Sequence, residues 1–240
     1  MRIAQITDHH LTVDGSPFQG IDNEGRWLAA LEEAKKLDAN YLLLTGDFCA
    51  QEPVEQVYER VKAHLDTIGL PFMILAGNHD DRSMIRQYFD ISGESDEPIY
   101  QHLHLNGYDW LLLDSSQHYV DDEQLNWLKQ ELEASPKPII AIHHPPCLMG
   151  ADFMDKHYPL QNWTEVMQAL HDADKPISVF CGHYHFSLQA QISKVNVYCA
   201  APTSFFIHPI GEEIAFIEKK ARVQLIELEE EQLLVRSMEV

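Results

Sequence analysis

The chain has 240 residues, and 45% of them are hydrophobic, which is enough to bury a sizeable core as one domain. Only 17 Lys and Arg stand against 38 Asp and Glu, so the formal net charge is -21 and no basic stripe is available to bind a nucleic-acid backbone. Nucleic acid is therefore excluded as the main partner. An anionic substrate would need a local cationic group, for which metal ions are candidates, and the 14 His are consistent with metal binding.

The four cysteines are scattered without a C-x-x-C pair, which argues against a disulfide framework or a structural zinc site. The chain enters a predicted strand directly after Met1, without the apolar segment of a signal peptide. Its apolar runs are all shorter than the ~20 residues that a membrane helix needs. We therefore expect a soluble cytoplasmic protein with reduced thiols and no membrane association.

The first part of the chain alternates between strand and helix patterns. Short apolar runs predict strands over residues 2–7, 41–45 and 71–75. Helical periodicity predicts helices between them, over residues 23–37 and 54–68. This alternation is typical of a sheet with parallel strands, whose carboxyl ends lie along one edge.

The later part of the chain predicts a mixture of helices and hairpins. A helix is expected over residues 82–89, and Asn106-Gly107 marks the turn between strands 99–105 and 108–113. The elements that follow are helix 121–132, strand 138–142, loop 147–162, helix 163–171 and strand 177–181. The remainder is predicted as a hairpin, 186–192 and 195–200, and a meander, 214–219, 221–228 and 232–238. No repeat or linker divides the chain, so we predict one domain over residues 1–240 with two sheets.

Polar clusters follow five of these strands or lie at their ends. They are Asp8-x-His10, Gly46-Asp47, Gly77-Asn78-His79-Asp80, His143-His144 and Gly182-His183-Tyr184-His185. Because the carboxyl ends of parallel strands share one edge, we expect the clusters to converge. Carboxylate, imidazole and amide oxygen together suit Mn, Fe, Zn or Co. The candidate ligands exceed the needs of one ion, which predicts two ions ~3.5–4 Å apart that share a carboxylate.

The spacing within the clusters has a local explanation. In an extended segment residues i and i+2 point the same way, so Asp8 with His10, and His183 with His185, are expected to face one pocket. Gly77 is expected to free the backbone for the three polar residues after it. A single D-x-H would more often be a surface accident, and a single G-D is often only a turn. The argument rests on all five clusters at predicted strand ends.

The ordered motifs D-x-H, G-D, G-N-H-D, H-x-P and G-H-x-H resemble those of the calcineurin-like metallophosphoesterases. More narrowly, Gly-Asn-His-Asp-Asp, His-His-Pro-Pro and Cys-Gly-His-x-His are similar to the bacterial class III cyclic nucleotide phosphodiesterases and related glycerophosphodiesterases. The resemblance covers residues 1 to about 200. It implies an α/β fold of four layers, α-β-β-α, with two mixed sheets flanked by helices.

The resemblance also implies a role for each cluster residue. The first metal ion would be held by Asp8, His10, Asp47 and His185. Asp47 would bridge to the second ion, whose other ligands would be Asn78, His143 and His183. His143 is preferred to His144 because the family ligand precedes x-Pro, and whether His144 shares a metal- or phosphate-binding role stays open.

Two further residues of the G-N-H-D motif are predicted to act in catalysis. The resemblance implies that His79 contacts the phosphate or the leaving oxygen rather than a metal. Asp80 is expected to orient a neighbouring imidazole. Asp8-His9-His10 also spells D-H-H, a signature of a different manganese phosphoesterase family. In that family the triplet lies well inside the chain, whereas here it ends the first strand.

The implied activity is hydrolysis of a small phosphodiester by a metal-activated hydroxide at a dinuclear centre. Cyclic nucleotides, 3′,5′-cyclic AMP foremost, are the first substrate class, and Mn or Fe are favoured as the two ions. Glycerophosphodiesters or phosphomonoesters are the alternatives, and a metal-bound scaffold without activity is a third. The loop 147–162 is predicted to form a wall of the pocket or a variable surface, and oligomeric state and metal identity stay open.

Overall fold

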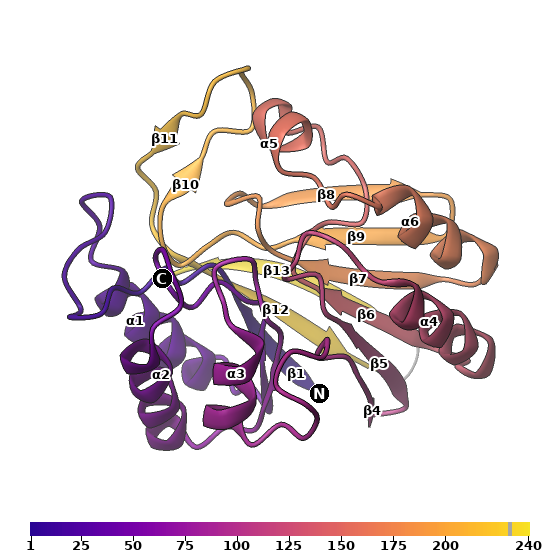
Figure 1. The fold of residues 1–240 in the computed structure, drawn as a ribbon, viewed down its shortest axis with the longest axis horizontal. Coiled ribbons are helices and arrows are strands. Elements are labelled where there is room, and N and C mark those ends of the chain that lie inside the picture. The colour runs from indigo at the N-terminus through magenta and orange to yellow at the C-terminus, as the bar shows by residue number, and fades with distance from the viewer. Residues whose placement is uncertain (230–231) are drawn as a thin grey trace.

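The computed structural model describes residues 1–229 and 232–240, and its elements form four layers (Figure 1). The first sheet has the order β13-β12-β1-β2-β3. Its strands are β1 (Arg2–Ile6), β2 (Tyr41–Leu44), β3 (Phe72–Ile74), β12 (Arg222–Leu228) and β13 (Leu233–Glu239). β1, β2 and β3 are parallel, and β12 and β13 add antiparallel strands at the other edge.

The second sheet has the order β4-β5-β6-β7-β9-β8. Its strands are β4 (Gln101–Leu105), β5 (Tyr108–Leu113), β6 (Pro138–Ile142), β7 (Ile177–Cys181), β8 (Leu188–Ile192) and β9 (Val195–Cys199). The four central strands are parallel, and the two edge strands are antiparallel to their neighbours. Both sheets are therefore mixed, as predicted.

Helices cover the outer faces of the two sheets (Figure 1). The first sheet packs against α1 (Asn23–Lys36), α2 (Glu55–Ile68) and α3 (Arg82–Phe89). The second packs against α4 (Asp122–Ala134), α5 (Asp152–His157) and α6 (Trp163–Asp172). A third apolar cluster lies between the sheets and joins Leu43 of β2 to Trp110 of β5 and Phe180 of β7. These layers confirm the predicted α-β-β-α sandwich.

The Asn-Gly turn of the predicted hairpin has the expected geometry. Asn106 and Gly107 both have positive φ, 52° and 78°, which a two-residue type I′ turn requires. The hairpin pairs β4 with β5 in antiparallel register. Here local turn chemistry was sufficient to predict the connection between the strands.

Two predictions about the later part of the chain are wrong. The segment 147–162, predicted as a loop, contains α5. The segment 214–219, predicted as part of a C-terminal meander, instead carries β11 (Phe216–Ile217), which pairs with β10 (Phe206–Ile207). These two short strands form a separate hairpin that projects from the sandwich in Figure 1. Strands this short have too few residues to show an alternating pattern.

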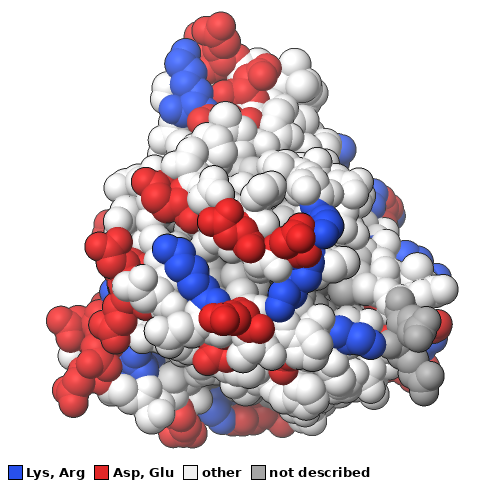
Figure 2. Space-filling model, turned by 90° about the vertical axis from the view of Figure 1, so that its right-hand side faces the viewer, with Lys and Arg blue, Asp and Glu red and all other residues white. Residues whose placement is uncertain are grey.

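One face of the molecule carries a mixture of acidic and basic side chains (Figure 2). On the face shown in Figure 2, Lys and Arg side chains are interspersed among Asp and Glu rather than gathered into one patch. Across the described residues, no helix combines the length and the apolar character needed to cross a bilayer.

Candidate metal centre

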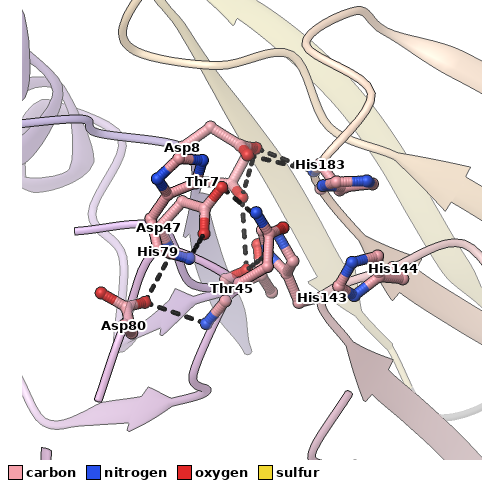
Figure 3. Close-up of polar contacts among 12 residues, drawn as sticks. Thr7, Asp8, Thr45, Asp47, His79, Asp80, His143, His144 and His183 are labelled. Carbon is pink, nitrogen blue, oxygen red and sulfur yellow. Dashed lines mark hydrogen bonds and ion pairs between the residues drawn. The ribbon is translucent and has the colours of Figure 1, made fainter. Parts of the chain in front are cut away.

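The five polar clusters converge at the carboxyl ends of β1, β2, β3, β6 and β7, as the parallel topology predicts (Figure 3). Three of these strands belong to the first sheet and two to the second. The centre is therefore built where the two sheets face each other, and neither sheet supplies all of its donor atoms.

The first group of donors contains Asp8, His10, Asp47 and His185, all buried, with donor atoms within 4.8 Å of one another. His10 Nε2 lies 3.1 Å from His185 Nε2, and His185 Nε2 lies 3.4 Å from Asp8 Oδ1. The structure thus brings together the four residues predicted to hold the first ion.

The second group lies beside the first and contains His143, His144 and His183. His143 Nε2 is 3.2 Å from Asn78 Oδ1 and 3.4 Å from Asp47 Oδ2. The same Asp47 oxygen is 3.6 Å from His10 Nε2 in the first group. Asp47 is therefore placed between the two groups, where a bridging carboxylate is needed.

The hydrogen bonds of three histidines fit metal binding. Nδ1 of His185 is 2.7 Å from the Phe205 carbonyl, and Nδ1 of His143 is 2.6 Å from the Thr45 carbonyl. A carbonyl oxygen only accepts, so each of these Nδ1 atoms carries a proton, and Nε2 is the nitrogen left to bind a metal ion. His183 has the opposite arrangement, because its Nε2 donates to a backbone carbonyl at 3.0 Å. Its free lone pair is on Nδ1.

The donor residues are held in an uncommon backbone conformation. Positive φ values are found at Asp8 (52°), His10 (47°), Asp47 (59°), His183 (69°) and His185 (52°). Residues other than glycine rarely adopt this left-handed region, and such strain is concentrated at functional sites. The prediction that i and i+2 converge because the chain is extended is therefore wrong. Left-handed turns after the strands direct these side chains inward.

Charge within the centre is carried by a buried ion pair. Burial acts to raise the pKa of Asp47, but His143 and its hydrogen bond hold that pKa well below the usual range. Burial likewise opposes the charge on His143, yet Asp47 raises the pKa of this imidazole to about 10. An incoming cation would replace the proton of His143 as the partner of Asp47, so metal binding should release a proton.

His79 lies at the rim, outside both donor groups. Its backbone N–H donates to Asp47 Oδ1 at 2.9 Å, and its Nδ1 donates to the Gln51 carbonyl at 3.0 Å. Its half-buried ring meets the His10 ring edge-on at 5.0 Å. The remaining nitrogen, Nε2, is thereby left available to a substrate, which is compatible with the predicted contact to phosphate or leaving oxygen.

Asp80 has a different role from the predicted one. Its carboxylate accepts hydrogen bonds from the backbone N–H groups of Asp47, Phe48 and Gly77 at 2.8–3.0 Å, and from the Tyr58 hydroxyl at 3.1 Å. None of these four donors is an imidazole. Burial and the nearby Asp47 raise the Asp80 pKa to about 7, although its backbone partners oppose this shift. Asp80 thus fixes the turn that carries Asp47 (Figure 3).

Gly77 is needed for space rather than for backbone freedom. It is absent from the glycines with positive φ, unlike Gly46 with φ 94°. A Cβ at position 77 would clash with the Asp47 backbone nitrogen. The expectation that Gly77 frees the backbone is therefore wrong, and its role is to let two strand-end turns pack closely.

Ser115 and His118 lie beside the second group and were not predicted from the sequence. His144 Nδ1 lies 2.9 Å from Ser115 Oγ, and His144 Nε2 lies 3.1 Å from Nδ1 of His118. His118 is an isolated histidine in a loop, so its sequence context carries no signal. Ser115 follows the end of parallel strand β5, and that position could have added a sixth strand-end cluster.

The segment 147–162 is anchored to the centre. The Tyr158 carbonyl fixes His183, and Asp155 accepts from the backbone N–H groups of residues 149–151 at 2.8–2.9 Å. Asn162 makes two hydrogen bonds with the backbone of Val120, which follows the His118 loop. The segment is therefore hydrogen-bonded to a residue of the second donor group and is more than a variable surface.

The chain is similar to known proteins in sequence and in fold. A model of the calcineurin-like phosphoesterase family matches residues 1–187. The chain is 30% identical over 229 residues to a Fibrobacter succinogenes protein named "Probable cyclic nucleotide phosphodiesterase", covering 95% of this chain and 89% of that one. It is 27% identical to a cAMP/cGMP dual specificity phosphodiesterase of Mycobacterium tuberculosis, with 85% and 67% covered.

Solved structures show the same fold. A dimetal phosphatase from Danio rerio matches with a TM-score of 0.77 at 13% identity, covering 99% of this chain and 95% of that one. GAP50, the anchor in the inner membrane complex of Plasmodium, matches with a TM-score of 0.69 at 13% identity, covering 100% and 84%. The match of the family model over most of the chain establishes the relationship: the chain belongs to the calcineurin-like phosphoesterase family.

Proposed function

We propose that this protein is a metal-dependent phosphodiesterase that hydrolyses 3′,5′-cyclic nucleotides, cyclic AMP foremost. The observation that carries the proposal is the position of Asp47 Oδ2, 3.6 Å from His10 in one buried donor group and 3.4 Å from His143 in the next. Two adjacent groups that share a carboxylate suit a pair of cations. The names of the relatives from Fibrobacter succinogenes and Mycobacterium tuberculosis support the choice of a cyclic nucleotide.

The proposed ligands are those of the predicted scheme. The first ion would be held by Asp8, His10, Asp47 and His185, and the second by Asp47, Asn78, His143 and His183. When bound, the two ions supply the positive charge that binds phosphate and activates water. His144, although close to His183, already has Ser115 and His118 as partners of its two ring nitrogens, and we leave it outside the set.

The remaining residues prepare the centre for an anionic substrate. The local cations explain how a chain of net charge -21 can attract a phosphodiester. Asp80 fixes the turn of Asp47, and backbone carbonyls fix the rings of the histidines. His79 presents Nε2 at the rim, where a protonated ring would donate to the departing alkoxide or to the phosphate.

We also propose the setting in which this chemistry takes place. The mixture of carboxylate, imidazole and amide oxygen suits Mn, Fe, Zn or Co, and among these Mn and Fe are our proposed ions. Residues 1–240 act as one catalytic domain, because both sheets supply donors and share an apolar cluster. The four cysteines are free and buried, which suits a reducing cytoplasm.

A substrate panel with added Mn tests the proposal. We expect turnover of bis-p-nitrophenyl phosphate to exceed that of p-nitrophenyl phosphate, and 3′,5′-cyclic AMP to be hydrolysed faster than glycerophosphodiesters. Faster hydrolysis of glycerophosphodiesters than of 3′,5′-cyclic AMP would make the protein a glycerophosphodiesterase. Faster turnover of the monoester would make it a phosphatase. No turnover at all would favour a scaffold; GAP50, which shares the fold, is described as an anchor in the inner membrane complex of Plasmodium.

The His79→Ala variant should keep its metal ions and lose rate. For cyclic AMP, whose leaving group is an alkoxide, we expect kcat to fall by about 10²–10⁴-fold. For bis-p-nitrophenyl phosphate the loss should be smaller, because p-nitrophenolate departs without a proton. The measurements are kcat for both substrates and metal content by mass spectrometry.

The matched control for this variant is His171→Ala, at an exposed histidine on α6. It should change neither kcat nor metal content. A His79→Ala protein with full activity on cyclic AMP would remove His79 from the mechanism.

A further inference from the structure

A recess of about 550 Å³ opens beside the first donor group. It is formed by the turn before α1, the start of α1 and the β10–β11 hairpin, which is the projecting hairpin in Figure 1. None of the proposed metal ligands lines it. Its volume falls within the range of ~300–1,000 Å³ that is typical of small-molecule sites.

Phe205 connects this recess to the metal centre. Its carbonyl accepts the hydrogen bond from His185 Nδ1 at 2.7 Å, and its ring stacks on the His185 imidazole with centroids 4.3 Å apart. The Phe205 ring also lies 5.0 Å from the ring of His10, and it lines the recess. Phe205 therefore borders both the recess and the first donor group. A ligand that bound its phosphate at the donors would have to extend past Phe205 to place its far end in the recess.

The wall of the recess offers an exposed aromatic surface. Phe216 meets Phe205 edge-on, with centroids 5.3 Å apart, and 48% of its surface is exposed to solvent. Ile21 and Ile217 also line the recess. A large apolar side chain held in the open next to a polar centre is suited to stacking with a planar group of a ligand.

The charged groups of the recess select against a second anion. Arg26 donates to the Ser204 carbonyl at 2.7 Å, and its guanidinium faces the carboxylates of Glu218 and Asp22. One cation against two carboxylates leaves the recess negative, which disfavours a second phosphate. The carboxylates are hydrogen-bond acceptors, and they suit the N–H groups of a neutral heterocycle.

We propose that this recess binds the base of a nucleoside phosphate, with Phe216 as the stacking surface. The inference rests on the proposed function, since the phosphate of the same ligand occupies the metal centre. It adds a specificity site that is separate from the metal ligands and is formed by the β10–β11 hairpin and the turn before α1.

The test compares two ligands that differ only by the base. Dissociation constants of 5′-AMP and ribose 5-phosphate are measured by titration calorimetry on the Mn-loaded protein. For the wild type we expect 5′-AMP to bind about tenfold more tightly, the size of one base–aromatic stack. Phe216→Ala should reduce this ratio towards one. Ile214→Ala, at a 45% exposed position of the same hairpin outside the recess, should preserve it.

Two results would overturn the base site: a wild-type ratio near one, or a ratio that Phe216→Ala leaves unchanged. Both can be told apart from failure of the proposed function, because turnover of cyclic AMP is measured separately. Hydrolysis of cyclic AMP with a ratio near one would retain the phosphodiesterase and remove the base site. Absence of hydrolysis would refute the activity, whereas the calorimetric ratio would still decide whether the recess recognises a base.

Discussion

Replacing Asp47 with alanine should abolish binding of both metal ions and lower the turnover of bis-p-nitrophenyl phosphate by about 10³-fold or more. The reason is the position of its carboxylate, which faces His10 in one donor group and His143 in the other. Removal of this carboxylate also leaves the buried His143 without its anionic partner. Metal content by mass spectrometry, kcat and circular dichroism measure ligation, catalysis and folding.

Asp66→Ala is the matched control for this experiment. The Asp66 side chain lies on α2 and is 61% exposed. Within the described part of the chain, its ion-pair partner is Lys62 of the same helix. This variant should retain two ions and full turnover. A folded Asp47→Ala protein that retained both ions and its activity would contradict the dinuclear model.

Asp80→Asn should destabilise the fold near the centre. Three backbone N–H groups and the Tyr58 hydroxyl converge on the two carboxylate oxygens of Asp80. Asparagine offers one oxygen, and its NH₂ group would face donors instead of acceptors. We expect the free energy of unfolding to fall by about 2–4 kcal/mol, measured by urea denaturation. Activity should fall as well, because the turn that carries Asp47 loses its support.

The neighbouring Asp81→Asn variant provides the control. Asp81 caps α3 by accepting from the Met84 backbone N–H at 2.9 Å, and asparagine is an equally good N-cap. Its stability should stay within about 0.5 kcal/mol of the wild type. Equal stabilities of the two variants would mean that the hydrogen bonds of Asp80 contribute little.

Much of the architecture could be predicted from the sequence because its signals are local. Apolar runs with polar ends define β1, β2 and β3, and parallel order then requires those ends to meet at one edge. The Asn106-Gly107 turn specifies its hairpin through the positive φ that both residues accept. The gathering of the cluster residues follows from the first of these signals, the polar ends of parallel strands.

The rest depends on contacts between distant segments. The role of Asp80 could not be predicted, because its donors lie on two different strand-end turns and on α2. His118 contacts His144 only through the packing of a loop, and it carries no motif. The pairing of β11 with β10 rather than with the C-terminal strands is likewise determined by tertiary contacts. A sequence pattern shows which residues are polar, but not which carbonyl or amide each will meet.

The division of the donors between two sheets has a consequence for the chain as a whole. His10 and His185, which meet at the first group, are 175 residues apart in sequence. An ion bound to both would act as a cross-link that closes a very long loop, and such closures remove much of the freedom of an unfolded chain. The same ion would resist sliding of one sheet over the other. Metal ions at this centre would therefore stabilise the packing of the two sheets as well as take part in the reaction.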